Sequence, residues 1–119
     1  MICHIARGEE WEAAQEEEAG GEYKPAQLEE DGFIHCSMPK QVEQVANERF
    51  TGEEGLVLLW IAPAKVKAGV LYERPKGQET GELYPHVHGP LNVDAVVKVN
   101  KLKPWQKGGF VLPPEPPLE

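Results

Sequence analysis

Residues 56–62 read Leu-Val-Leu-Leu-Trp-Ile-Ala, the longest uninterrupted apolar run in this chain of 119 residues. A run of this length suits one β-strand and is too short to cross a membrane. Strands that lack polar alternation are typically buried on both faces of a sheet. Pro63 follows directly and ends the strand, because proline cannot donate a ladder hydrogen bond. The run therefore predicts a central strand around which the other elements pack.

The sequence before this strand predicts two units in which a strand is followed by a helix. The expected strands are Ile2–Ala6 and Phe33–Cys36, both rich in β-prone residues. The expected helices cover residues 8–19, which are rich in Glu and Ala, and 40–50, where apolar residues recur at helical spacing. Residues 20–32 between the two units are predicted to be a loop.

The sequence after the central strand predicts further strands at 70–73, 83–88 and 95–102. In the last of these, valines alternate with polar residues, which is typical of a half-exposed strand. The order of elements indicates an α+β fold with mixed or mostly antiparallel sheets and two main helices. We expect a single domain over residues 1–112 and a stiff, solvated, proline-rich tail over 113–119.

The charge is acidic and uneven along the chain. The formal net charge is −8, with −10 in residues 1–54 and +2 in residues 55–119. An acidic protein of this kind is not expected to bind extended nucleic acid, which needs a basic surface. We expect the glutamates between residues 9 and 18 to face solvent and the ligand site to draw on the second half. A single nucleotide-sized ligand then remains compatible with the total charge.

The two cysteines, Cys3 and Cys36, each lie inside an apolar run. Such sparse use of cysteine is typical of a reducing compartment, and the first residues show no secretory leader. We therefore expect buried thiols in a cytoplasmic protein without a membrane segment. A disulfide between the two remains an open alternative.

The histidines are the residues most suited to chemistry. His4 and His35 lie in the first two predicted strands, and His86 and His88 lie two residues apart in an extended segment. Residues at this spacing share one face of a strand, so the last two imidazoles are expected to point the same way. Each histidine next to a cysteine points away from it, which favours one face with imidazoles and another with buried thiols.

The sequence shows neither a C-x-x-C nor an H-E-x-x-H spacing, so we expect no metal ion. The alternative is a metal-dependent enzyme in which His86 and His88 bind the ion with His4 or His35, and Glu73 or Glu82 nearby.

An anion site is a further possibility at the start of the second helix. Ser37 is expected to cap that helix, and its hydroxyl would join the free N–H groups of the first turn.

Three segments together resemble a known family. They are Cys3-His4-Ile5, the run Asp-Gly-Phe-Ile-His-Cys-Ser at 31–37, and the run Tyr-Pro-His-Val-His-Gly-Pro-Leu at 84–91. They resemble the bacterial and plant family catalogued as domain of unknown function 952, over about residues 1–102. The resemblance implies a fold similar to ADP-ribosyltransferases, and especially to RNA 2′-phosphotransferases. Those enzymes bind NAD or an ADP-ribosylated intermediate in a cleft between two small sheets.

The resemblance also implies roles for individual residues. His4 matches the histidine that contacts the nicotinamide ribose, and His35 matches the residue that packs on the nicotinamide. Ser37 matches the small hydroxyl residue two places further on. Glu73 and Glu82 are candidates for the carboxylate that many relatives place at a third motif. Basic side chains that could meet phosphates are Arg7, Lys98, Lys101, Lys103 and Lys107.

The sequence therefore predicts a small cytoplasmic protein that binds NAD or another ADP-ribose-containing nucleotide and is a candidate for ADP-ribose transfer. The expected catalytic residues are His4, His35, His86 and Glu73, and the expected ligand-binding residues are His4, His35, Ser37, His86 and His88. The alternatives are a binding module without turnover, for a nucleotide or a protein, and the metal-dependent enzyme described above. In the protein-binding case, the acidic first helix would be the interaction face.

Overall fold

The apolar run at the centre of the sequence forms β4 (Leu56–Ile61), the middle strand of a three-stranded antiparallel sheet. Its neighbours are β1 (Ile2–Arg7) and β8 (Val96–Leu102). Successive residues of β4 enter two separate apolar clusters, with Leu59 in one and Trp60 in the other. The central strand is thus buried on both faces, which confirms the prediction.

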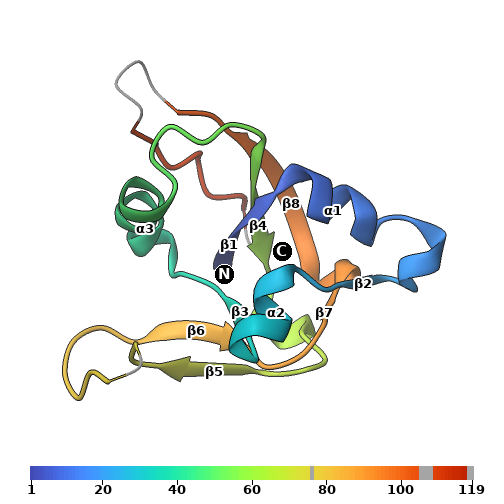
Figure 1. The fold of residues 1–119 in the computed structure, drawn as a ribbon, viewed down its shortest axis with the longest axis horizontal. Coiled ribbons are helices and arrows are strands. Elements are labelled where there is room, and N and C mark those ends of the chain that lie inside the picture. The colour runs from blue at the N-terminus through green and yellow to red at the C-terminus, as the bar shows by residue number, and fades with distance from the viewer. Residues whose placement is uncertain (76, 105–108, 118–119) are drawn as a thin grey trace.

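The structure is a computed structural model that describes residues 1–75, 77–104 and 109–117. The two main helices are α1 (Gly8–Ala14) and α3 (Val42–Arg49), which lie on opposite sides of the β1-β4-β8 sheet (Figure 1). No helix in the described part of the chain is long and apolar enough to pass through a bilayer.

Two smaller antiparallel sheets complete the fold. One has the order β3-β6-β5, formed by β3 (Ile34–His35), β6 (Tyr84–Val87) and β5 (Val70–Glu73). The other pairs β2 (Glu22–Tyr23) with β7 (Leu91–Asn92). The α+β class, the antiparallel pairing and the two main helices are therefore confirmed.

The first helix is shorter than predicted. It ends at Ala14, and only a single 3₁₀ turn, Glu17–Ala19, follows. Trp11 and Ala14 are its buried residues, whereas the glutamates after Gln15 are exposed and gain nothing from packing. Carboxylates at a helix C-terminus are also unfavourable because they face the negative end of the helix dipole.

The segment predicted as a loop contains a third helix, α2 (Ala26–Asp31), in addition to β2. Its N-cap is Pro25, which cannot cap the helix with its own side chain, so the usual sequence signal for a helix start is missing. The N–H of Ala26 donates instead to Oε2 of Glu10 at 2.8 Å, a contact between distant parts of the sequence. Gly32 ends the helix with a φ of 84° and donates its N–H to the Leu28 carbonyl at 2.9 Å. This left-handed turn, which favours glycine, leads directly into β3.

The last strand is more exposed than its alternating sequence predicts. Val97 and Val99 of β8, an edge strand of its sheet, are 44% and 40% exposed. Asn100 instead makes an inward contact and accepts a hydrogen bond from the indole nitrogen of Trp60 at 2.8 Å.

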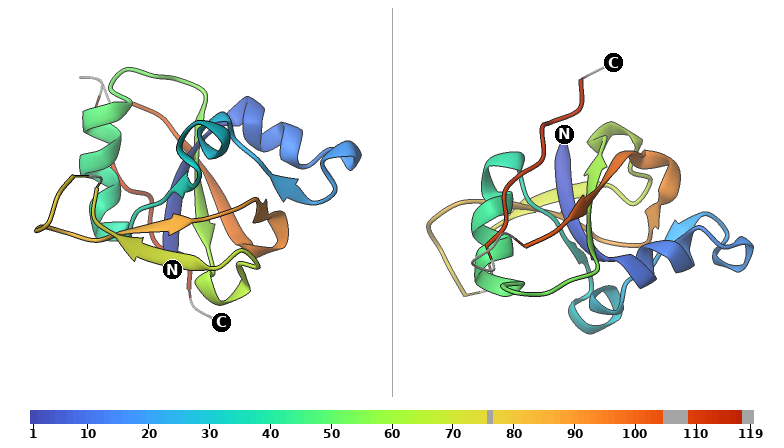
Figure 2. Two further views of the ribbon diagram at one scale, coloured as in Figure 1. Left: turned by 60° about the horizontal axis from the view of Figure 1, so that its bottom comes forward. Right: turned by 90° about the horizontal axis from the view of Figure 1, so that it is seen from above.

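The chain before the proline-rich tail packs against α3 (Figure 2). Phe110 is buried in the cluster that α3 covers, and its N–H donates to Asn47 Oδ1 at 2.7 Å. Leu112 donates its N–H to Glu43 Oε2 at 2.8 Å. These contacts fasten residues 109–112 to the domain. The boundary at residue 112 stays a prediction, and residues 118–119 of the tail lie outside the described residues.

We expect Phe110→Ala to lower the free energy of unfolding by about 3–5 kcal/mol, because it empties a buried aromatic site. The matched control is Val111→Ala, which truncates a neighbour that is 51% exposed and should cost less than about 0.5 kcal/mol. Urea unfolding followed by circular dichroism measures both. Equal effects of the two substitutions would contradict the packing of this segment.

Candidate functional site

The two three-stranded sheets are joined at one point next to the candidate site. Cys3 and Ser37 exchange backbone hydrogen bonds, N–H to carbonyl in both directions, each at 2.8 Å. This bridge connects β1 to the chain that leaves β3. A cavity of about 1010 Å³ lies beside it, at the upper end of the usual size of small-molecule sites. The cavity is lined by the site residues predicted from the sequence: His4, His35, Ser37, Glu73, His86 and His88.

His4 is buried, and both of its ring nitrogens are used inside the protein. Nδ1 lies 2.6 Å from the carbonyl oxygen of His35, and Nε2 lies 2.7 Å from the hydroxyl of Tyr23. A carbonyl only accepts, so Nδ1 carries the proton and Nε2 accepts from the tyrosine hydroxyl. Burial lowers the pKa of His4 to about 4, which keeps the ring neutral. His4 therefore holds β1, β2 and β3 together.

Aromatic rings gather on the face of the β3-β6-β5 sheet that is turned away from the apolar core. Phe33 stacks on His86, with ring centroids 4.1 Å apart and an angle of 24° between the planes. The same phenyl ring lies 4.6 Å from the ring of His35 and 5.1 Å from that of His88. Ile34 and Val87 point the other way into the core. The alternation of strand residues thus separates the ring cluster from the core.

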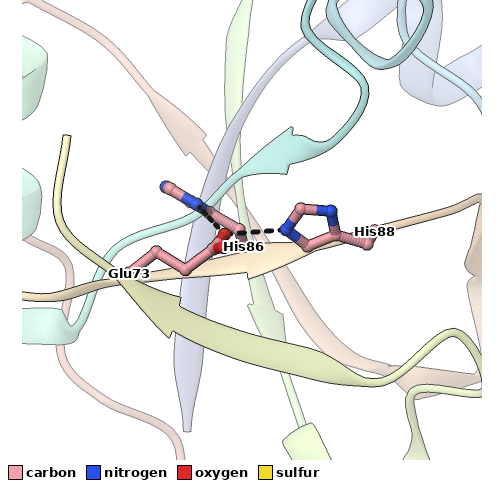
Figure 3. Close-up of side chains that lie close together, drawn as sticks. All are labelled: Glu73, His86 and His88. Carbon is pink, nitrogen blue, oxygen red and sulfur yellow. Dashed lines mark hydrogen bonds and ion pairs between the residues drawn. The ribbon is translucent and has the colours of Figure 1, made fainter. Parts of the chain in front are cut away.

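One carboxylate connects two of these imidazoles (Figure 3). Oε1 of Glu73 lies 2.8 Å from Nδ1 of His86 and 2.7 Å from Nε2 of His88. Because a carboxylate only accepts, both ring nitrogens donate to it. Within the described residues, these three side chains form the one group whose nitrogen and oxygen atoms are close enough to hold a metal ion, all within 4.8 Å of one another. His35 makes a separate pair with Asp31 at 2.9 Å.

The pKa shifts in this group have clear physical causes. Hydrogen bonds from His88 and His86 lower the pKa of Glu73, so this carboxylate stays ionised at neutral pH. Burial lowers the pKa of His86, against the opposing effect of Glu73. A neutral imidazole that donates through Nδ1 presents Nε2 as an acceptor. His86 is therefore suited to accept a proton or a hydrogen bond.

The thiols are unsuited to nucleophilic chemistry. Cys3 and Cys36 are both free and buried, which confirms the prediction of buried thiols. Burial raises the pKa of Cys3 to about 12 and also raises that of Cys36. Neither forms a thiolate at neutral pH.

The charge around the cavity differs from the sequence-based expectation. Its basic lining residues in the described part of the chain are Arg49 and Arg74, and the predicted Arg7, Lys98, Lys101 and Lys103 line other surfaces. Lys107 lies outside the described residues. Five carboxylates also line the cavity, three of them from the acidic first half: Glu30, Asp31, Glu48, Glu73 and Glu82. The second half alone does not supply the site, because α2 and α3 border the cavity.

Ser37 is not the helix cap that the sequence predicts. The chain enters α3 through a 3₁₀ turn, Pro39–Gln41, whose N-cap is Met38, and the N–H of Met38 donates to Oε1 of Gln41 at 2.8 Å. Ser37 is buried and bound to β1 through its backbone, although it still lines the cavity. The cap role predicted for Ser37 is therefore wrong, whereas the anion site at this helix start stays a prediction.

Sequence reasoning missed four contributors to the site. Phe33 carried a usable signal, since it lies two residues before His35 and must share its face. Tyr23, Arg49 and Arg74 carried none, because their positions depend on contacts between elements that are distant in the sequence.

Comparisons place the chain among known proteins. The family described as "Protein of unknown function (DUF952)" matches residues 5–99. The crystal structure of protein CC0527 from Caulobacter crescentus is similar, with a TM-score of 0.79 and 31% identity over 93% of each chain. A crystal structure of a double mutant of that protein gives the same values. Its solution NMR structure has a TM-score of 0.67 and 29% identity, over 91% of this chain and 89% of that one. No curated protein matches the chain.

The buried His4 should make stability depend on pH. In the unfolded chain its pKa is about 6.5, whereas in the fold it is about 4. Between these values the unfolded state binds a proton that the folded state does not bind, so stability falls as the pH falls. We expect about 2 kcal/mol of the free energy of unfolding to be lost on this account between pH 7.5 and 5.

Urea unfolding at both pH values tests this for the wild type, for His4→Gln and for the control His88→Gln. His4→Gln should remove most of the pH dependence and the control should keep it. An unchanged pH dependence in His4→Gln would show that other groups cause it.

Proposed function

The chain belongs to the DUF952 family, and we propose that it binds NAD or another ADP-ribose-containing nucleotide in the cavity between its two larger sheets. The observation that carries the proposal is the ring cluster on the cavity wall, in which Phe33 packs against His35, His86 and His88. Flat heterocycles such as adenine and nicotinamide stack on surfaces of this kind, typically with about 1–3 kcal/mol for each ring.

Two arginines support a ligand that also carries phosphate. Arg49 at the end of α3 and Arg74 directly after β5 both line the cavity. Guanidinium groups recognise phosphate oxygens through paired hydrogen bonds. A dinucleotide combines flat rings with a diphosphate, so it matches both parts of the lining.

The same cavity supports a role in ADP-ribose transfer. Cleaving the N-glycosidic bond of NAD builds positive charge on the ribose, which a nearby carboxylate stabilises. Glu73 is kept ionised by its two histidine partners, and His86 presents an accepting nitrogen. Glu82 lines the cavity as a second candidate carboxylate. The similarity to ADP-ribosyltransferases and RNA 2′-phosphotransferases is part of this proposal.

His4 takes a different role in this proposal from the one that the family resemblance implies. Both of its nitrogens are occupied by His35 and Tyr23, so it has no free donor for a ribose. We therefore assign His4 as a positioning residue, which fixes the backbone of His35 at the cavity wall. His35 and His86 are the imidazoles that remain for ligand contact.

A binding module without turnover is the second candidate. It is favoured by the two hydrogen bonds that occupy both ring nitrogens of His4, because the histidine expected to contact the ribose then has no free donor for it. Nicotinamide release separates the two candidates: a transferase releases it when NAD is bound, and a binding module does not.

The proposal predicts saturable binding of NAD or ADP-ribose in calorimetric titration with EDTA present. Phe33→Ala should weaken that binding by about tenfold or more, because it removes the centre of the ring cluster. The matched control is Val99→Ala, a truncation on the exposed edge of β8, which should leave the affinity unchanged.

Circular dichroism and urea unfolding check that both variants remain folded. The absence of heat with either ligand at millimolar concentration would refute the proposed function. If both substitutions weakened binding equally, the ring cluster would not be part of the ligand site.

A further inference from the structure

We propose that Glu73, His86 and His88 form a binding site for a divalent transition-metal ion such as Zn²⁺, with one coordination position open to the cavity. This proposal does not rest on the proposed function: Glu73 and His86 belong to both sites, but the metal ion needs only these three side chains, which β5, β6 and the residue after β6 carry. It departs from our sequence-based expectation that no metal is bound.

The strand register explains why these side chains converge. In the antiparallel β5-β6 pair, Leu71 lies opposite His86 and Glu73 lies opposite Tyr84. Opposite residues share a face, so Glu73 and His86 are diagonal neighbours on one face of the sheet, within reach of long side chains. His88, two residues after His86, continues the same face. Figure 3 shows the carboxylate of Glu73 between the two imidazoles.

The distances suit a metal ion after small adjustments. The three ligand atoms all lie within 4.8 Å of one another, and two of the contacts are hydrogen bonds of 2.8 and 2.7 Å. Ligands about 2.1 Å from a tetrahedral Zn²⁺ are roughly 3.4 Å apart. The side chains of Glu73 and His88 are 39% and 36% exposed, so they have room to move apart from the hydrogen-bonded distances to the spacing of zinc ligands.

The ligand set is one that proteins use for catalytic zinc. Two imidazole nitrogens and one carboxylate occupy three of four positions and leave the fourth for water or substrate. Each imidazole can free the nitrogen that would bind the metal ion by moving its proton to the other ring nitrogen, so no proton is lost. His86 would move its proton from Nδ1 to Nε2, and His88 from Nε2 to Nδ1, and the metal ion would replace both hydrogen bonds to Glu73.

The charge of the cavity gives independent support for a cation. Five carboxylates and two guanidinium groups are among its lining residues, which leaves a formal excess of negative charge. A divalent cation offsets that excess where Glu73 meets the imidazoles. Imidazole ligands favour Zn²⁺ over Mg²⁺, which prefers oxygen donors and keeps its water.

The test is a titration of the full chain, purified without a histidine tag and freed of metal, with Zn²⁺ in competition with a chromophoric chelator. No nucleotide is present, so the result does not depend on the proposed function. We expect one Zn²⁺ to bind per chain and no binding of Mg²⁺ at the same concentrations. His88→Ala and Glu73→Gln should each weaken Zn²⁺ binding at least about tenfold.

The matched control is His35→Gln, which removes a cavity imidazole outside the three-residue group, 5.5 Å from the ring of His86. It should keep the affinity of the wild type. His88 is partly exposed, so His88→Ala tests the site even if substitution of the buried His86 prevents folding. Failure to bind a stoichiometric amount of Zn²⁺, or an equal loss in His35→Gln and His88→Ala, would overturn the proposal.

Discussion

The reciprocal hydrogen bonds between Cys3 and Ser37 are the constraint on which the cavity depends. They join the free edge of β1 to the chain that has just left β3, so the two three-stranded sheets are connected along one line, the seam. The next residue of β1, His4, strengthens the seam through the carbonyl of His35 and the hydroxyl of Tyr23. Buried hydrogen bonds with no unsatisfied partner are costly to break, so the cavity wall is rigid along this line.

The two faces of the small β3-β6-β5 sheet have different roles: one packs into the core and the other forms part of the candidate site. One face supplies Ile34 and Val87 to the core, and the other carries the rings and the carboxylate of Glu73. Because the side-chain period of a strand is two, a shift of one residue in the register would bury the polar group and expose the core. Stability therefore selects the register that also assembles the candidate site.

The sequence predicts most of the large elements and much of the candidate site. The uninterrupted apolar run over 56–62 identifies the central strand, because a run of this length without polar residues is typical of a strand that is buried on both faces. Alternation places His86 and His88 on one face without any knowledge of the fold. The helix over Ala26–Asp31 is missed because its N-cap is Pro25, and the carboxylate that binds its first N–H comes from the distant Glu10. The sequence names Glu73 only as one of two carboxylates near His86 and His88, because the register of β5 against β6, which brings Glu73 to them, is not recorded in any local pattern.

The position of β4 has a consequence for the order in which the protein can fold during synthesis. Its partners are the first strand and the last, and the cluster behind it is closed by Phe110. The chain that leaves the ribosome first must therefore wait for residues made much later before its main sheet is complete. Contacts between such distant parts of a chain slow folding. Until then, the edge of β4 that pairs with β8 stays unpaired, and the cluster that Phe110 completes stays open.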